Sequence, residues 1–258
     1  MDVIALIADF ARRLAQAVSA AQQYTHHADT SRILQQGLLP TSLAAIPRMD
    51  THVVYEPTGD GATAGGDFYD LFRTTDGRWC FALGDVCGHG AEAAVIVGLV
   101  RPLLKVLAED GYSVSRILNR LNRVLVDDAM PIAEFASARH ARQWDEIRPV
   151  SLLYGELMPD AHGTLRCALA SAGHPVPLLL HTDGSVRPAA EPQLLLGVME
   201  HTAYECQEFT FESGDTMLCV TDGVTERRCG KRQFDDDGGL SQTLSSCVGL
   251  GQPESRSR

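Results

Sequence analysis

A series of short β-rich runs separated by turn sequences is the feature that most constrains how this chain can fold. Turn signals such as TDG, HTDG and ESGD punctuate the runs, which is typical of strands joined by tight connections. The predicted strands are His52–Pro57, Phe68–Thr74, Arg78–Val86, Val150–Met158, Leu165–Ser171, Val176–Thr182, Cys206–Phe211 and Thr216–Asp222.

Two helical segments separate the third predicted strand from the fourth. Segment 91–110 is apolar almost all round and is expected to be buried against a sheet, whereas segment 113–128 is amphipathic. Residues 129–148 lack periodicity and are expected to form a mobile loop. Because strict alternation of strands and helices is absent, the order favours an α+β fold, with antiparallel sheets covered by helices, over a doubly wound α/β fold.

The first forty residues are predicted to be helical. In segment 3–24, apolar residues recur at alternating steps of four and three, which makes one apolar stripe. This helix either packs on its own domain or forms a short coiled coil with a second copy or an upstream module. A second, short helix is expected over 31–40, where Pro40 ends it.

Composition excludes several classes of function. A net charge of −11 argues against a nucleic-acid partner, which would need a basic face, but is compatible with divalent cations. The seven cysteines are scattered and never in CxxC spacing, so neither a disulfide framework nor a zinc ribbon is expected. The N-terminus reads as neither a signal peptide nor a membrane span, which predicts a soluble cytoplasmic protein without a membrane partner.

Three acidic residues stand beside glycine at the ends of strand-like runs: Asp67 in GGD, Asp85 in GDVCGHG and Asp222 in TDGVTE. Any one of them could simply begin a turn, but three such corners suggest convergence on one site. Carboxylates brought close together repel one another unless a cation lies between them. Two divalent ions bridged by a carboxylate would supply a shared hydroxide nucleophile and a clamp for a phosphoryl group.

These segments resemble the metal-dependent serine/threonine protein phosphatases (PPM type), in the bacterial branch related to the stage II sporulation E phosphatase. The resemblance runs in order through LQQGLLP, YEPTGDGATAGGDFYDLF, GDVCGHGAEAA, SLLYGEL, ASAGHPVPLLL, LLLGV and GDTMLCVTDGVTERR. It implies a four-layer αββα sandwich with two central antiparallel sheets. It also divides the chain into an N-terminal helical linker or coiled-coil segment, residues 1–40, and a phosphatase domain, residues 41–258.

The resemblance also implies roles for single residues. Asp85 corresponds to the carboxylate that bridges both metal ions, and Asp67 and the carbonyl of Val86 correspond to ligands of the second ion. Asp222 corresponds to a ligand of the first, so Asp67, Asp85 and Asp222 are the expected catalytic residues, with two Mn²⁺ or Mg²⁺ ions as cofactors. Further acidic and histidine residues of the motifs are expected to have structural roles, namely Asp70 and Glu226 in turn hydrogen bonding and His174 in the AGHP sequence.

The chain departs from the family pattern near its C-terminus. Family members carry a further metal-binding Asp in an Asp-Asp pair before a last strand, which this chain is expected to lack. Asp235, Asp236 and Asp237 are available, but they are expected to form a solvated acidic turn. Either the chain is truncated or the first ion is held by one ligand fewer.

The activity implied is that of a protein serine/threonine phosphatase, a phosphoric monoester hydrolase. In this branch the typical substrate is a phosphorylated anti-sigma-factor antagonist, which implies a role in bacterial sigma-factor signalling. The alternative is a non-catalytic or weakly active pseudophosphatase that binds a phosphoprotein, favoured by the missing ligand. A third interpretation, a homodimeric scaffold, depends on helix 3–24 alone.

Overall fold

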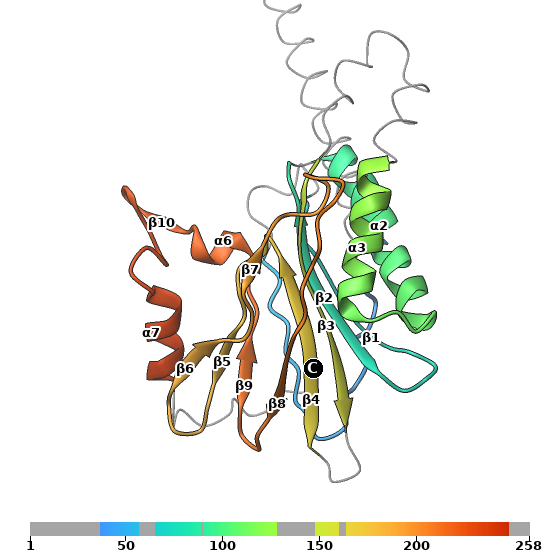
Figure 1. Ribbon diagram of the computed structural model, residues 1–258. Coiled ribbons are helices and arrows are strands. Elements are labelled where there is room, and N and C mark those ends of the chain that lie inside the picture. The colour runs from blue at the N-terminus through green and yellow to red at the C-terminus, as the bar shows by residue number, and fades with distance from the viewer. Residues whose placement is uncertain (1–36, 57–64, 89, 128–147, 160–163, 248–258) are drawn as a thin grey trace, which may run out of the picture.

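The computed structural model describes residues 37–56, 65–88, 90–127, 148–159 and 164–247, and they form the predicted α+β fold (Figure 1). Within these residues no helix is long and apolar enough to cross a bilayer. The larger sheet contains β1 (Phe68–Arg73), β2 (Trp79–Val86), β3 (Val150–Pro159), β4 (Leu165–Ala172), β7 (Pro192–Gln193) and β8 (Gln207–Phe211). The other strands are β5 (Leu178–Leu180), β6 (Val186–Pro188), β9 (Thr216–Leu218), β10 (Arg228–Cys229) and β11 (Arg232–Gln233), and the helices are α2 (Ala91–Glu109), α3 (Val114–Asp127), α6 (Asp222–Thr225) and α7 (Gly239–Ser246).

The larger sheet is built on four successive antiparallel strands, β1 to β4. Two short strands share the outer edge of β4: β8 pairs antiparallel with its first half and β7 pairs parallel with its last two residues. Strands β6, β5 and β9 form a separate antiparallel sheet. Chain segments that are far apart in the sequence therefore meet in both sheets.

Helices α2 and α3 pack on one face of the larger sheet (Figure 1). The core there is mostly aliphatic and includes Val97, Val100 and Leu104 of α2, Ile117, Leu118 and Leu121 of α3, and Val86, Leu152 and Tyr154 of the strands. Helix α2 is not covered all round, because Val95 and Val106 are 55% and 56% exposed. One sheet and one neighbouring helix cannot cover the whole circumference of a helix that is apolar on every side.

The opposite face of the larger sheet packs on the smaller sheet. A second core lies between them, with Trp79, Leu153 and Leu169 on one side and Leu179 on the other. Segment 43–49 also contributes, and Trp79 Nε1 donates a hydrogen bond to the carbonyl of Ala45. Helix α7 contacts β5 and β6 on the side away from α2 and α3 (Figure 1). The elements thus follow the order helix pair, larger sheet, smaller sheet, helix.

Three local predictions differ from the structure. The predicted strand Thr216–Asp222 is shorter, because β9 ends at Leu218 and Asp222 begins helix α6. The run 52–57 is not a strand where the structure describes it, and Val54 is 85% exposed, because no neighbouring strand pairs with its β-favouring residues. Helix α7 and the β10–β11 hairpin were not predicted, since their sequences are polar and short. Residues 3–24, most of 31–40 and all but Arg148 of 129–148 lie outside the described residues. Gly37 and Leu38 are helical, as predicted for the end of the second helix.

Asp70 joins β1 to α2 by a buried ion pair. Its carboxylate is 4% exposed, and its Oδ2 accepts hydrogen bonds from Arg101 Nη2 at 2.7 Å and Nε at 3.1 Å. Lys105 Nζ lies 3.0 Å from the same oxygen. Arg101 also donates to the carbonyl of Leu38, so one guanidinium connects three segments. The turn hydrogen bonding expected for Asp70 is therefore replaced by a contact between strand and helix.

We expect Asp70→Asn to lower the free energy of unfolding by roughly 1.5–3 kcal/mol, the range for a lost hydrogen bond to a charged group. The matched control is Glu208→Gln, which breaks an ion pair to Arg166 whose side chains are 58% and 63% exposed. That change should stay within roughly 0.5 kcal/mol, because exposed ion pairs contribute little. Urea unfolding of both variants measures the difference, and equal costs would contradict the structural role of Asp70.

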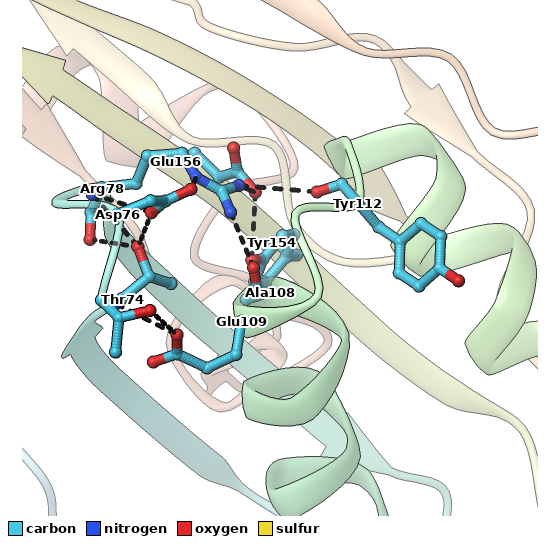
Figure 2. A network of polar contacts seen from close by, with 9 residues as sticks. Thr74, Asp76, Arg78, Ala108, Glu109, Tyr112, Tyr154 and Glu156 are labelled. Carbon is cyan, nitrogen blue, oxygen red and sulfur yellow. Dashed lines mark hydrogen bonds and ion pairs between the residues drawn. The ribbon is translucent and has the colours of Figure 1, made fainter.

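A second polar network fixes the C-terminal end of α2 (Figure 2). Arg78 donates from Nη1 to Glu156 Oε1 at 2.8 Å and from Nη2 to the carbonyl of Ala108 at 2.6 Å. Glu109 accepts hydrogen bonds from the backbone and the hydroxyl of Thr75. Because the last carbonyls of a helix have no partner within the helix, these contacts hold α2 on the β1–β2 hairpin.

Candidate metal centre

The three predicted carboxylates come from separate parts of the fold and lie at one end of it. Asp67 immediately precedes β1, and Asp85 is the penultimate residue of β2. Because β1 and β2 are antiparallel neighbours, the start of one lies beside the end of the other. Asp222 begins α6, just after β9 of the smaller sheet. The preceding Thr221 brings its Oγ1 to 3.5 Å from Asp67 Oδ2, so this turn meets the β1–β2 corner.

The charges of these carboxylates act on one another. Partial burial, followed by the charges of Asp67 and Asp222, raises the pKa of Asp85 to about 7. Burial and Asp222 raise the pKa of Asp67 to about 6, against a lowering effect of the Thr221 hydroxyl. Carboxylates disfavour ionisation in this way when they are close together without a compensating cation. The site therefore concentrates negative charge.

Gly66 lets the β1 and β2 corners approach each other. A Cβ at this position would lie 2.2 Å from the carbonyl oxygen of Val86 and 2.5 Å from Asp85 Oδ1. The Val86 amide donates to the Gly66 carbonyl at 3.2 Å, which holds the two segments together. Gly66 of the GGD sequence is thus required by a close approach. Its contact with Val86 places the carbonyl of Val86 against the residue that directly precedes Asp67.

The donor set fits a hard divalent cation. Two partly buried carboxylates, one exposed carboxylate and a backbone carbonyl are the oxygen ligands that Mg²⁺ and similar ions prefer. The carboxylates interact electrostatically, but they are not gathered around a single ion position. Across the described parts of the chain, no three His, Cys, Asp or Glu side chains are close enough together to form a complete ligand cluster.

Sequence reasoning missed the contribution of Arg148. Its Nη1 donates to the carbonyl of Cys87 at 3.2 Å, and it also pairs with Glu92 near the start of α2. The guanidinium therefore holds the loop that follows Asp85. Nothing in the sequence around Arg148 indicated this contact. Burial and the charges of Asp85 and Asp222 raise the pKa of the Cys87 thiol, which disfavours the thiolate form that a cysteine nucleophile needs.

The other acidic residues of the C-terminal part make local contacts. Asp235 accepts from the Leu240 amide at 2.9 Å, Asp236 accepts from the Gln233 amide at 2.8 Å, and Asp237 pairs with Arg232. The three residues form the predicted acidic turn. Glu226 is exposed at the C-terminal end of α6.

Comparison with known proteins gives the same result for family and fold. A sequence model of the family "Stage II sporulation protein E (SpoIIE)" matches residues 75–255. Protein IcfG of Synechocystis is 25% identical over 229 residues, which cover 84% of this chain and 35% of the relative. Phosphoserine phosphatase RsbU of Bacillus subtilis is 26% identical over 196 residues, covering 76% and 52% respectively. The chain thus spans between about a third and a half of the length of these relatives.

Two solved structures have a similar fold. The structure of the RsbU and RsbW domains of Rv1364c from Mycobacterium tuberculosis has a TM-score of 0.56 and 27% identity, and covers 72% of this chain and 46% of that one. The SiaA-PP2C domain of Pseudomonas aeruginosa has a TM-score of 0.57 and 17% identity, and covers 92% and 93%. Because the SiaA-PP2C domain is only 17% identical to this chain, its similarity shows the fold alone. The match over residues 75–255, together with this fold, places the chain in the stage II sporulation protein E (SpoIIE) family.

Proposed function

We propose that this chain is a metal-dependent protein serine/threonine phosphatase that hydrolyses a phosphoserine or phosphothreonine on a regulatory protein. The observation that carries the proposal is the electrostatic coupling of Asp67, Asp85 and Asp222, which come from three motifs and two sheets. Family membership and the similarity to a phosphoserine phosphatase of Bacillus subtilis support the same activity.

The chain's own residues would hold two divalent ions. Asp85, whose pKa is raised to about 7, would share its charge between both ions. Asp67 and the carbonyl of Val86 would complete one site, and Asp222 would contribute to the other. Two ions, when bound, supply charge that polarises a phosphoryl group and lowers the pKa of water. The protein residues then keep both ions at the corner where the substrate phosphate must bind.

The substrate we propose is a phosphorylated anti-sigma-factor antagonist. It is supported by the similarity to RsbU and to a solved structure that contains RsbU and RsbW domains. A cytoplasmic location stays a prediction. So does a homodimer formed through residues 3–24, because these residues lie outside the part of the chain that the structure describes. The ions are proposed to be Mn²⁺ or Mg²⁺.

Hydrolysis of p-nitrophenyl phosphate and of a phosphoserine peptide, with Mn²⁺ and with EDTA, tests the activity. We expect turnover of both substrates only with the metal. Absence of Mn²⁺-dependent turnover, in a protein that still binds the phosphopeptide, would favour a second function: a pseudophosphatase that binds a phosphoprotein. The observation that favours this second candidate is that no three ligand side chains of the described residues close on one point.

Calorimetric titration with Mn²⁺ should reveal two sites of unequal affinity. One ion would have three protein ligands, from Asp67, Asp85 and the Val86 carbonyl. The other ion would have only two, from Asp85 and Asp222, and the number and charge of the ligands tune affinity. Protons compete with Mn²⁺ for Asp67 and Asp85 below their raised pKa values of about 6 and about 7. The affinity of both sites for Mn²⁺ should therefore rise as the pH is raised from about 5.5 to about 7.5. Two equally tight sites, or affinities independent of pH, would contradict this assignment.

A further inference from the structure

The two halves of the candidate metal centre belong to different sheets. Asp85 lies on β2 of the larger sheet, whereas Asp222 follows β9 of the smaller sheet. No backbone ladder joins these two strands, so the separation of the two carboxylates depends on how the sheets pack. A side chain that contacts both segments would fix it.

His174 lies in the connection that passes from one sheet to the other. It follows β4 of the larger sheet and precedes β5, which pairs with β9 in the smaller sheet. The connection is held firmly, because Ser171 Oγ donates to the carbonyl of His174 at 2.7 Å and the Gly173 amide donates to the Gln193 carbonyl at 2.7 Å. The turn that carries the His174 ring is therefore held by two independent hydrogen bonds.

The imidazole contacts the Asp85 side of the site through one nitrogen. Its Nδ1 is 3.0 Å from Ser151 Oγ, and Ser151 is the residue of β3 that pairs with Asp85 of β2. The residue is 3% exposed. Burial lowers the pKa of His174 to about 4, so the ring is neutral and carries one N–H. When the Ser151 hydroxyl donates to Nδ1, that N–H is on Nε2.

The other nitrogen of the ring remains available for a second contact. Nε2 is buried and has no hydrogen-bond partner within ordinary geometry. The backbone of Val220, two residues before Asp222, is near enough to raise the pKa of His174 and so to offset part of the lowering by burial. An unpaired buried donor costs free energy, so a small approach of this segment to the ring is favourable.

We propose that His174 is a positioning residue that sets the distance between Asp85 and Asp222, through Ser151 on one side and the Val220 backbone on the other. The proposal rests on the proposed function only in that these carboxylates bind divalent ions. The ring touches neither the substrate nor the ions. It would act by holding the smaller-sheet corner against the larger-sheet corner.

Mn²⁺ affinity, measured by calorimetry on the full chain, tests the proposal. His174→Gln keeps an amide that reaches the Nε2 position, whereas His174→Asn is shorter and reaches only toward Ser151. We expect His174→Asn to weaken Mn²⁺ binding by roughly 10–100-fold, the usual effect of losing a group that orients metal ligands, and His174→Gln to recover most of it. Equal affinities in the two variants would overturn the proposal.

Ser171→Ala distinguishes a positioning role of His174 from a merely structural one. This change removes the hydrogen bond to the His174 carbonyl in the same turn but leaves the ring in place. It should lower the melting temperature without changing Mn²⁺ affinity, and a parallel loss of both would overturn the positioning role. Metal binding that depends on His174 without any hydrolysis would reject the phosphatase activity and keep the proposal. Hydrolysis by the wild type, with an Mn²⁺ affinity that is unchanged in His174→Asn, would support the phosphatase activity and overturn the positioning role of His174.

Discussion

Replacing Asp85 with Asn should reduce Mn²⁺-dependent phosphate ester hydrolysis by at least about a hundredfold, because stabilisation by bound metal ions is worth several kcal/mol. Burial first, and then the charges of Asp67 and Asp222, raise the pKa of Asp85 to about 7, and Asp85 is the carboxylate that we propose to share between both ions. An amide of the same shape keeps the packing of β2 but removes that charge. Metal binding should weaken at both sites, and steady-state turnover with calorimetry measures both effects.

The control for this variant is Asp50→Asn, which neutralises an exposed carboxylate in segment 37–56, before the first strand. It should keep full activity. The fold of Asp85→Asn should remain intact, since removing a charge from a repulsive cluster does not destabilise the metal-free protein. Retention of most Mn²⁺-dependent activity by Asp85→Asn would rule out the two-metal assignment.

Gly66→Ala should destabilise the protein and abolish tight metal binding together. The new methyl group would lie 2.2 Å from the Val86 carbonyl oxygen and 2.5 Å from Asp85 Oδ1, well inside contact distance. Backbone must move to relieve the overlap, at a cost of roughly 1–3 kcal/mol. The movement separates Asp67 from the Val86 carbonyl, so we expect turnover to fall even at temperatures where the variant is folded.

Gly37→Ala is the matched glycine control, because no other part of the described chain lies within 4 Å of its added methyl group and the residue is helical. Alanine there should be neutral or slightly stabilising, since it favours helix more than glycine does. Thermal unfolding and Mn²⁺ titration of both variants separate close approach from a general effect of losing glycine. A Gly66→Ala protein that binds Mn²⁺ like the wild type would show that the β1 and β2 corners need not meet.

The sequence by itself determined the elements whose signals are local. The apolar periodicity of 91–110 and 113–128 predicted α2 and α3 to within one residue at each end, at Ala91–Glu109 and Val114–Asp127. The longer strands were also evident, since β-branched and apolar runs between turn residues need no distant partner to be recognised. The Gly-Asp corners were also recognisable as turns, although only Asp85 lies at the end of a strand, since Asp67 immediately precedes β1 and Asp222 begins α6.

The tertiary structure alone decided which residues these elements bring together. Run 52–57 has strand composition, but its described residues, 52–56, are not part of a strand, whereas polar α7 forms where it packs on β5 and β6. Asp70 could be assigned to an ion pair only once α2 had placed Arg101 against β1. His174 lies between the two sheets for a similar reason, and the necessity of Gly66 comes from Val86, which pairing of β1 and β2 brings beside it. Contacts between residues distant in the chain depend on how the sheets and helices pack, and no local pattern encodes that packing.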